Sequence, residues 1–102
     1  MKSIIDGKIY DTEKAEGVAT WSNGYEPSDF DHRAETLYRT ESGAYFLHGV
    51  GHANSPYAGH YGNMRGLGEA IIVMDKQEAC DWLSGHDPDK AVELFGNLLQ
   101  EA

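Results

Sequence analysis

Cysteine is almost missing from the sequence, because Cys80 is the only one among 102 residues. A single thiol excludes an intrachain disulfide and a metal cluster held by several thiolates. No segment approaches the roughly 18 consecutive apolar residues of a membrane-spanning helix. The first ten residues also lack the apolar run of a signal peptide. We therefore expect a cytoplasmic protein that makes no membrane contact.

Positive charge is also scarce. Lys and Arg number 8 against 17 Asp and Glu, so the net charge is −9. Affinity for phosphate depends on clustered Lys and Arg, so this balance disfavours direct binding to nucleic acid or to anionic membranes. The charge suits either solubility alone or docking on a basic protein surface.

The N-terminal two thirds of the chain predict short strands. Asp6-Gly7 between two apolar pairs indicates a tight hairpin turn. Asp11 or Thr12 is expected to cap one helical turn over 13–16. Further strands are expected over 18–21, 35–40, 44–48 and 69–74, with loops over 22–33 and 49–68. If side chains alternate along the central hairpin, Leu37, Arg39, Tyr45 and Leu47 share one face, and Tyr38, Phe46 and His48 share the other.

Two helices are expected at the C-terminal end. Asp75 and Glu78 have the spacing of a capping box at the start of the first helix, and Gly85 is expected to end it. Asp87-Pro88 has the cap and first-turn proline that open a second helix. Strands followed by helices predict a single α+β domain over 1–102, with a small antiparallel β-sheet and two C-terminal helices packed against it.

Several residue groups are candidate sites of chemistry. His48, His52 and His60 lie in or beside a glycine-rich segment, but the glycines between the first two disfavour the helix that would align them as metal ligands. The glycine-rich segment is followed by a predicted strand, whereas a phosphate-binding loop is followed by a helix. Cys80 falls on the apolar side of a helix, as a small buried residue would. We expect no catalytic residue, no cofactor and no metal.

Acidic residues gather in the early loop and in the helical end. A rigid array of carboxylates can imitate phosphate spacing and occupy a basic groove, although a solvated charged face is the simpler interpretation. Exposed aromatic side chains are expected to support such a contact. The residues expected to bind a partner are Glu26, Asp29, Asp31, Tyr57, Tyr61, Asp81, Asp89 and Glu93.

Two parts of the chain resemble a group of small bacterial proteins from phages and mobile elements. The first runs from IIDGKIYDTEKAE at 4–16 through WSNGY at 21–25 to ETLYRTESGAYFLHG at 35–49, and the second is GEAIIVMDKQEACDWL at 68–83. The resemblance supplies no catalytic residues, and the stretch 49–62 departs from it. Small acidic proteins of such elements are often inhibitors of host defence, including anti-CRISPR proteins.

The resemblance and the charge together predict a non-enzymatic inhibitor in the cytoplasm of a bacterial host cell. It would occupy a basic groove of a nucleic-acid-processing defence complex, a Cas protein being one such partner. Two alternatives stay open at this point. One is a metal-dependent enzyme that uses His48, His52 and His60, and the other is a structural or regulatory homodimer formed through an exposed strand edge.

Overall fold

In the computed structural model, which describes residues 1–102, four strands form an antiparallel sheet. Their order is β3 (Glu16–Ser22), β4 (Arg33–Arg39), β5 (Tyr45–Gly51) and β8 (Gly68–Met74). Two separate hairpins pair β1 (Lys2–Ile5) with β2 (Lys8–Asp11) and β6 (Gly59–Tyr61) with β7 (Met64–Gly66). The chain ends with α1 (Lys76–His86), α2 (Pro88–Phe95) and a 3₁₀ turn, η1 (Gly96–Leu98).

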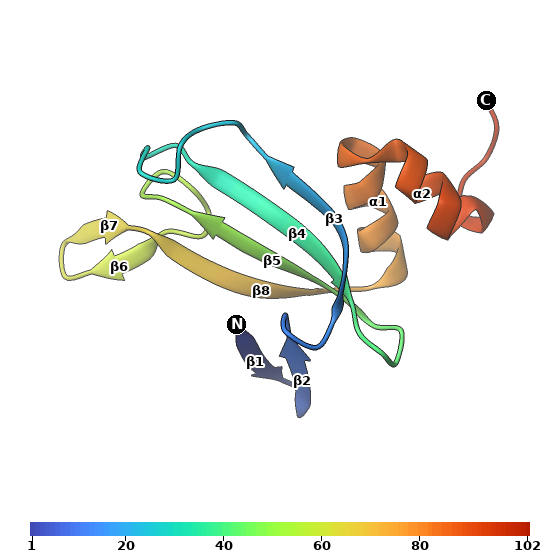
Figure 1. The fold of residues 1–102 in the computed structure, drawn as a ribbon, viewed down its shortest axis with the longest axis horizontal. Coiled ribbons are helices and arrows are strands. Elements are labelled where there is room, and N and C mark those ends of the chain that lie inside the picture. The colour runs from blue at the N-terminus through green and yellow to red at the C-terminus, as the bar shows by residue number, and fades with distance from the viewer.

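The arrangement confirms the predicted α+β class (Figure 1). The helices lie at one end of the molecule, the β6–β7 hairpin lies at the other, and the β1–β2 hairpin projects below the sheet in this view. Neither helix is long and apolar enough to cross a bilayer.

The N-terminal hairpin turns where the sequence predicts. Asp6 and Gly7 have φ angles of 52° and 75°, the pair of positive values that a tight hairpin turn requires. The helical turn expected over 13–16 is wrong, because Glu16 already belongs to β3. Asp11 does cap this region: its Oδ1 accepts a hydrogen bond from the Glu13 amide at 3.0 Å, and its carbonyl accepts one from the Ala15 amide at 3.0 Å.

The central hairpin of β4 and β5 has the predicted alternation. Leu37 pairs with Leu47, and Tyr38 pairs with Phe46. Directly paired residues of antiparallel strands share a face, so Leu37 and Leu47 face the helices while Tyr38 and Phe46 face the opposite side. The sheet therefore has two apolar faces to cover.

The first face is covered by the helices, which begin as predicted. Asp75 and Glu78 form the capping box of α1, and Asp87 accepts a hydrogen bond from the Lys90 amide at the start of α2. Helix α1 runs one residue past the predicted Gly85. The resulting core includes the buried Cys80, as expected for a small apolar residue. Its members are Leu37, Tyr45, Leu47, Ala79, Cys80, Trp82, Leu83, Ala91 and Phe95.

The second face has a smaller apolar cluster beneath the N-terminal hairpin. Phe46 is fully buried there. Its ring stacks on Tyr38 at 5.2 Å between centroids and meets the ring edge of Tyr10, from β2, at 5.6 Å. The β1–β2 hairpin is thus fixed to the sheet by aromatic contacts on the side away from the helices.

Ile71, Ile72 and Val73 have the composition of core residues, but the structure does not bury all three. Ile72 is 43% exposed and Val73 is 37% exposed. Their strand, β8, is an edge of the sheet, and the sequence alone does not reveal which strand lacks a neighbour. Ile71 is half-buried.

Candidate functional site

The most densely bonded polar side chain of the protein is the buried carboxylate of Glu35, on β4. It is 4% exposed and lies on the helix-facing side of the sheet, two residues from Leu37. It accepts hydrogen bonds from the Trp82 indole of α1 at 3.0 Å, from the Arg33 guanidinium at 3.0 Å, and from the Tyr57 hydroxyl. One carboxylate therefore connects strand β4, helix α1 and the loop over 52–58.

Glycines in the strands make room for that loop. Gly49 pairs with Glu35 across β4 and β5, and a Cβ atom at Gly49 would lie 2.0 Å from the Tyr57 ring. A Cβ at Gly51 would lie 2.0 Å from Ser55 Oγ, and one at Gly68 would lie 2.2 Å from the Tyr57 carbonyl oxygen. The glycines are thus needed for close packing of residues 52–58 on the sheet. The prediction of a loop over 49–68 is wrong in part, because the segment contains the end of β5 and the whole β6–β7 hairpin.

The surroundings of Glu35 favour its charged form. Burial raises the pKa of this carboxyl. The hydrogen bonds from Tyr57, Trp82 and Arg33, together with the guanidinium charge, lower it by more, so the pKa lies below the ordinary 4.5. Burial and the same carboxylate raise the pKa of the Tyr57 hydroxyl well above 10.0. Because its acceptor positions are occupied by protein donors and it is closed to solvent, Glu35 acts as a structural link and not as a free base.

Arg33 is the part of this network that reaches the surface. Its side chain is 40% exposed. The guanidinium lies over the Trp21 ring at 5.6 Å and over the Tyr57 ring at 5.9 Å. The Trp21 ring also contacts the His86 ring, at 4.8 Å between centroids, and His86 in turn contacts Trp82. A series of tilted aromatic contacts thus links Arg33 and Trp21 to the end of α1.

The acidic residues expected to bind a partner fall into two separate sets. Asp81 on α1 and Asp89 and Glu93 on α2 are all exposed. The set Glu26, Asp29 and Asp31 is also exposed but lies in the β3–β4 loop, at the opposite end of the sheet from α2 (Figure 1). The structure does not combine them into one surface.

Two of the loop acids also organise their own loop. Asp29 Oδ1 accepts a hydrogen bond from the Asp31 amide at 2.8 Å, and Asp31 Oδ1 accepts one from the Asn54 side chain at 2.8 Å. The second bond joins the β3–β4 loop to the segment that follows β5. Substitution of either residue would therefore change the loop as well as the charge.

The aromatic residues expected to contact a partner differ in their exposure. Tyr57, expected to be exposed, is 6% exposed, because its ring lies against Gly49 and its hydroxyl is held by Glu35. Contact between Tyr57 and a partner is incompatible with this position. Tyr61 is 60% exposed on β6, with its hydroxyl donating to the Leu67 carbonyl at 2.6 Å, and Tyr25 is also exposed.

The three histidines considered as metal ligands do not converge. His48 Nε2 lies 2.9 Å from Glu69 Oε2 on the face away from the helices. The His52 ring packs on Phe30 at 4.9 Å, and His60 lies in the β6–β7 hairpin. No group of three or more His, Cys, Asp or Glu side chains is placed to hold a metal ion. The geometry therefore opposes an enzyme built on these histidines.

No protein-family model, curated protein or solved structure matches this chain.

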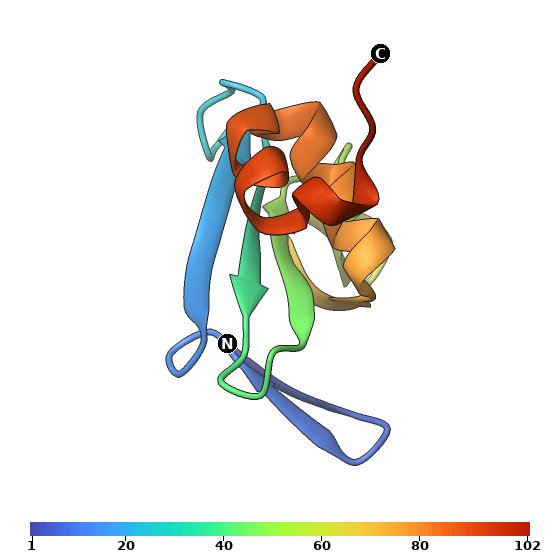
Figure 2. The ribbon, with the colours of Figure 1, turned by 90° about the vertical axis from the view of Figure 1, so that its right-hand side faces the viewer.

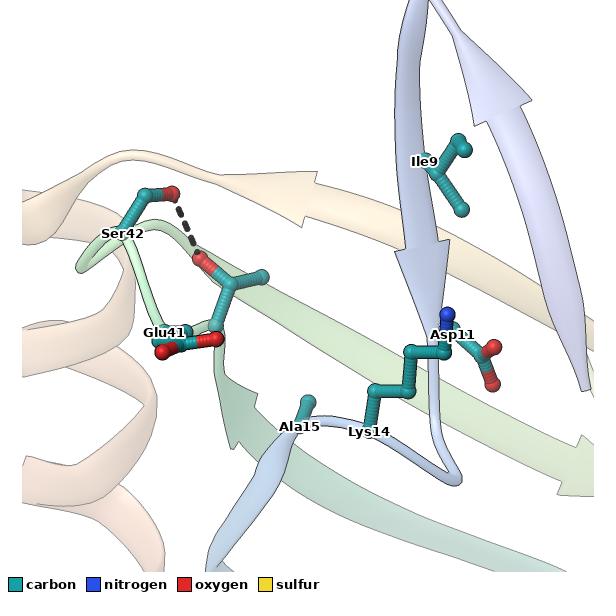
Figure 3. A pocket seen from close by; sticks show the side chains of 7 residues that line it. Ile9, Asp11, Lys14, Ala15, Glu41 and Ser42 are labelled. Carbon is teal, nitrogen blue, oxygen red and sulfur yellow. Dashed lines mark hydrogen bonds between the residues drawn. The ribbon is translucent and has the colours of Figure 1, made fainter.

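A hollow of about 290 Å³ separates the N-terminal hairpin from the β4–β5 turn (Figure 3). Its charged side chains are Asp11, Lys14 and Glu41. The hydroxyls of Thr40 and Ser42 are hydrogen-bonded to each other at 3.1 Å, and neither is bonded to a histidine or a carboxylate. The hollow thus lacks the paired nucleophile and base of a hydrolytic site.

Sequence reasoning missed the Glu35 network. The available signal was an acid at a core-facing position of an alternating strand, since Glu35 precedes the apolar Leu37 by two residues. Such an acid requires buried donors. The identity of these donors depends on the tertiary fold, because Trp82 is 47 residues from Glu35 in the sequence and Tyr57 is 22 residues away.

Proposed function

We propose that this chain is a non-enzymatic acidic binding protein of the bacterial cytoplasm. It occupies a basic groove of a nucleic-acid-processing defence complex, and anti-CRISPR activity is the specific form to test. The supporting observation is the unpaired surface charge: only four of the 17 Asp and Glu side chains lie within 4.0 Å of a cationic group or a histidine. The other carboxylates have no cationic partner in the protein, so their charge can attract an external basic surface.

The helical set is the better-supported part of this surface. Asp81, Asp89 and Glu93 are exposed on helices whose buried faces are packed into the core. Asp81 accepts a hydrogen bond from the Gln77 side chain at 2.9 Å, and Glu93 lies 3.2 Å from Lys90, so Asp89 is the member of the set without a partner in the protein. Carboxylates on packed helices keep a fixed spacing, so less conformational entropy is lost when they meet a partner. We therefore assign the main charged contact to α1 and α2.

The test compares charge removal at this surface with equal charge removal elsewhere. The variant Asp81→Asn/Asp89→Asn/Glu93→Gln loses three exposed carboxylates of the helices, and the control Glu13→Gln/Glu16→Gln/Glu41→Gln loses three exposed carboxylates near the N-terminal hairpin. Tagged proteins are incubated with lysate of a CRISPR-bearing host over a series of salt concentrations. Purified candidate complexes are then tested for inhibition of target binding.

We expect the wild type and the control to recover a nucleic-acid-binding complex and to inhibit it, with recovery falling as salt rises. The helical variant should lose both effects while keeping the wild-type melting temperature. Equal recovery and inhibition by all three proteins would remove the helical surface from the proposal. Absence of any salt-sensitive partner at low salt would contradict the proposed function itself.

A second candidate, a homodimer, is favoured by the free edge of β8. Natural edge strands are commonly protected by a charge, a proline or a bulge. The other edge strand, β3, has a bulge at Gly17–Ala19. Residues 70–74 of β8 contain none of these devices, and Ile72 and Val73 are partly exposed there.

Light scattering over a range of concentrations tests this candidate. A homodimer through β8 predicts a mass that rises from 11.3 kDa to twice that value and a return to the monomer in Ile72→Lys, because a lysine at an edge opposes strand pairing. A matched substitution on the other edge, Thr20→Lys, should leave the dimer intact. A monomer at every concentration would exclude the homodimer.

A further inference from the structure

A groove lies between the β4–β5 turn and the C-terminal helical segments. Its volume is about 610 Å³, within the range of roughly 300–1,000 Å³ that is typical of ligand sites. Figure 2 shows the C-terminal helices above the β4–β5 turn on this side of the molecule. The residues that line the groove are Arg39, Ser42, Gly43, Tyr45, Lys76, Leu94, Phe95, Asn97 and Leu98.

The charge of this groove is opposite to that of the whole protein. It is lined by two of the eight Lys and Arg side chains, Arg39 and Lys76, and by none of the 17 acids. Neither cation belongs to an ion pair of the protein. Glu16 and Glu41 line a neighbouring hollow with Arg39 but do not line the groove. The two cations are therefore available to an external anion.

Apolar surface lies beside these cations. The rings of Tyr45 and Phe95 pack at 5.3 Å between centroids and belong to the core. Leu94, in α2, is 37% exposed and Leu98, in η1, is 42% exposed. Both leucines line the groove and are partly exposed, so they offer apolar surface to a ligand that enters it.

We propose that this groove binds a short acidic peptide segment. A carboxylate of the segment contacts Arg39 and Lys76, and a neighbouring apolar side chain packs on Phe95 and Leu98. A guanidinium and an ammonium group both donate charge-assisted hydrogen bonds to carboxylates. The adjacent apolar surface accounts for selection of an apolar residue next to the acid.

Three features favour a peptide over a simple anion. The groove has both charged and apolar lining, it is large enough for more than a single carboxylate, and the uncharged Ser42 and Asn97 can hydrogen-bond a peptide backbone. The proposal uses none of the residues of the acidic surface on α1 and α2. It therefore stands or fails independently of the function proposed above.

The test uses fluorescence polarisation with a labelled peptide of sequence Gly-Glu-Leu-Phe-Gly and its Gln counterpart. The variant Arg39→Gln/Lys76→Gln removes both cations of the groove, and the control Lys2→Gln/Lys8→Gln removes two exposed cations of the N-terminal hairpin. We expect the Glu peptide to bind the wild type and the control. Its affinity should fall about tenfold or more with the groove variant or with the Gln peptide, because the charge-assisted contacts of the carboxylate with both cations are lost in each case.

Three outcomes would overturn the proposal. The first is equal binding of the Glu peptide to the groove variant and the control. The second is equal binding of the Glu and Gln peptides to the wild type. The third is absence of saturable binding of the Glu peptide at about 1 mM, the weak end of measurable affinity. Saturable binding of decanoate without binding of the peptide would assign the groove to an amphiphilic lipid instead.

Discussion

The hydroxyl of Tyr57 donates a hydrogen bond to the carboxylate of Glu35, and the ring that carries it lies on the backbone of Gly49. Gly49 is also the strand partner of Glu35. The absence of a side chain at one position of β5 thus allows a tyrosine from the following loop to reach an acid on β4. This arrangement predicts how the three positions respond to substitution.

The substitution Tyr57→Phe removes one donor from a buried carboxylate and leaves the ring in place. We expect the free energy of unfolding to fall by about 2 kcal/mol, as for hydrogen bonds to charged groups. Urea unfolding at pH 7 measures this change. Tyr25→Phe is the control, since Tyr25 is exposed and should change stability by less than about 0.5 kcal/mol. Equal effects of the two substitutions would contradict the assigned role of Tyr57.

The substitution Gly49→Ala is expected to be more severe. Its Cβ would lie 2.0 Å from the Tyr57 ring, so the ring must leave its place and lose its bond to Glu35. We expect a loss of about 3 kcal/mol or more in urea unfolding. Gly85→Ala is the matched control in α1, where nothing lies within 4 Å of an added Cβ, and it should stabilise the protein by about 0.5–1 kcal/mol.

The lowered pKa of Glu35 predicts a pH dependence that Glu35→Gln should abolish. Because the folded-state pKa is below the ordinary 4.5, the charged form contributes stability above that pH and the contribution disappears as pH falls through the folded-state pKa. At pH 7 we expect Glu35→Gln to be less stable than the wild type by about 1–3 kcal/mol. The NH2 group of the glutamine would meet hydrogen-bond donors where the carboxylate oxygen now accepts from them.

Urea unfolding of both proteins at several pH values from 7 to 3 measures this difference. The other carboxylates are common to both proteins, so their titration cancels in the comparison. The difference should be constant from pH 7 to about 5 and should shrink at lower pH. A difference that stays constant down to pH 3 would show that Glu35 is not the source of the dependence.

The capping box of α1 predicts a moderate effect at the surface. Asp75→Ala removes the acceptor for the Glu78 amide, a hydrogen bond of 2.8 Å, and should lower stability by about 1 kcal/mol. Asp81→Ala removes an exposed acid of the same helix that caps nothing, and is expected to change stability by less than about 0.5 kcal/mol. The melting temperature of Asp75→Ala, measured by circular dichroism, should therefore be lower than that of Asp81→Ala.

The parts of the fold that were predictable depend on local physics. The turn at Asp6-Gly7, the caps Asp75 and Asp87, and the alternation of Leu37 with Tyr38 each follow from a few neighbouring residues. They were sufficient to indicate the α+β class.

The rest depends on contacts between distant residues. Ile72 has the composition of a core residue, and its exposure follows only from the place of β8 at the edge of the sheet. Tyr57 stands in a glycine-rich segment typical of a surface loop, and its burial requires Gly49 and Gly68 at the right positions on two strands. The groove at Arg39 and Lys76 likewise joins positions 37 residues apart.

The single carboxylate of Glu35 also has a consequence for cooperativity. Because it bonds both the loop through Tyr57 and the helix through Trp82, opening either segment leaves a buried charge with fewer donors and so weakens the hold on the other. Local fluctuations of the two segments are therefore coupled. We therefore expect the amides of 52–58 and of α1 to exchange with solvent as one unit, although no backbone hydrogen bond joins the two segments.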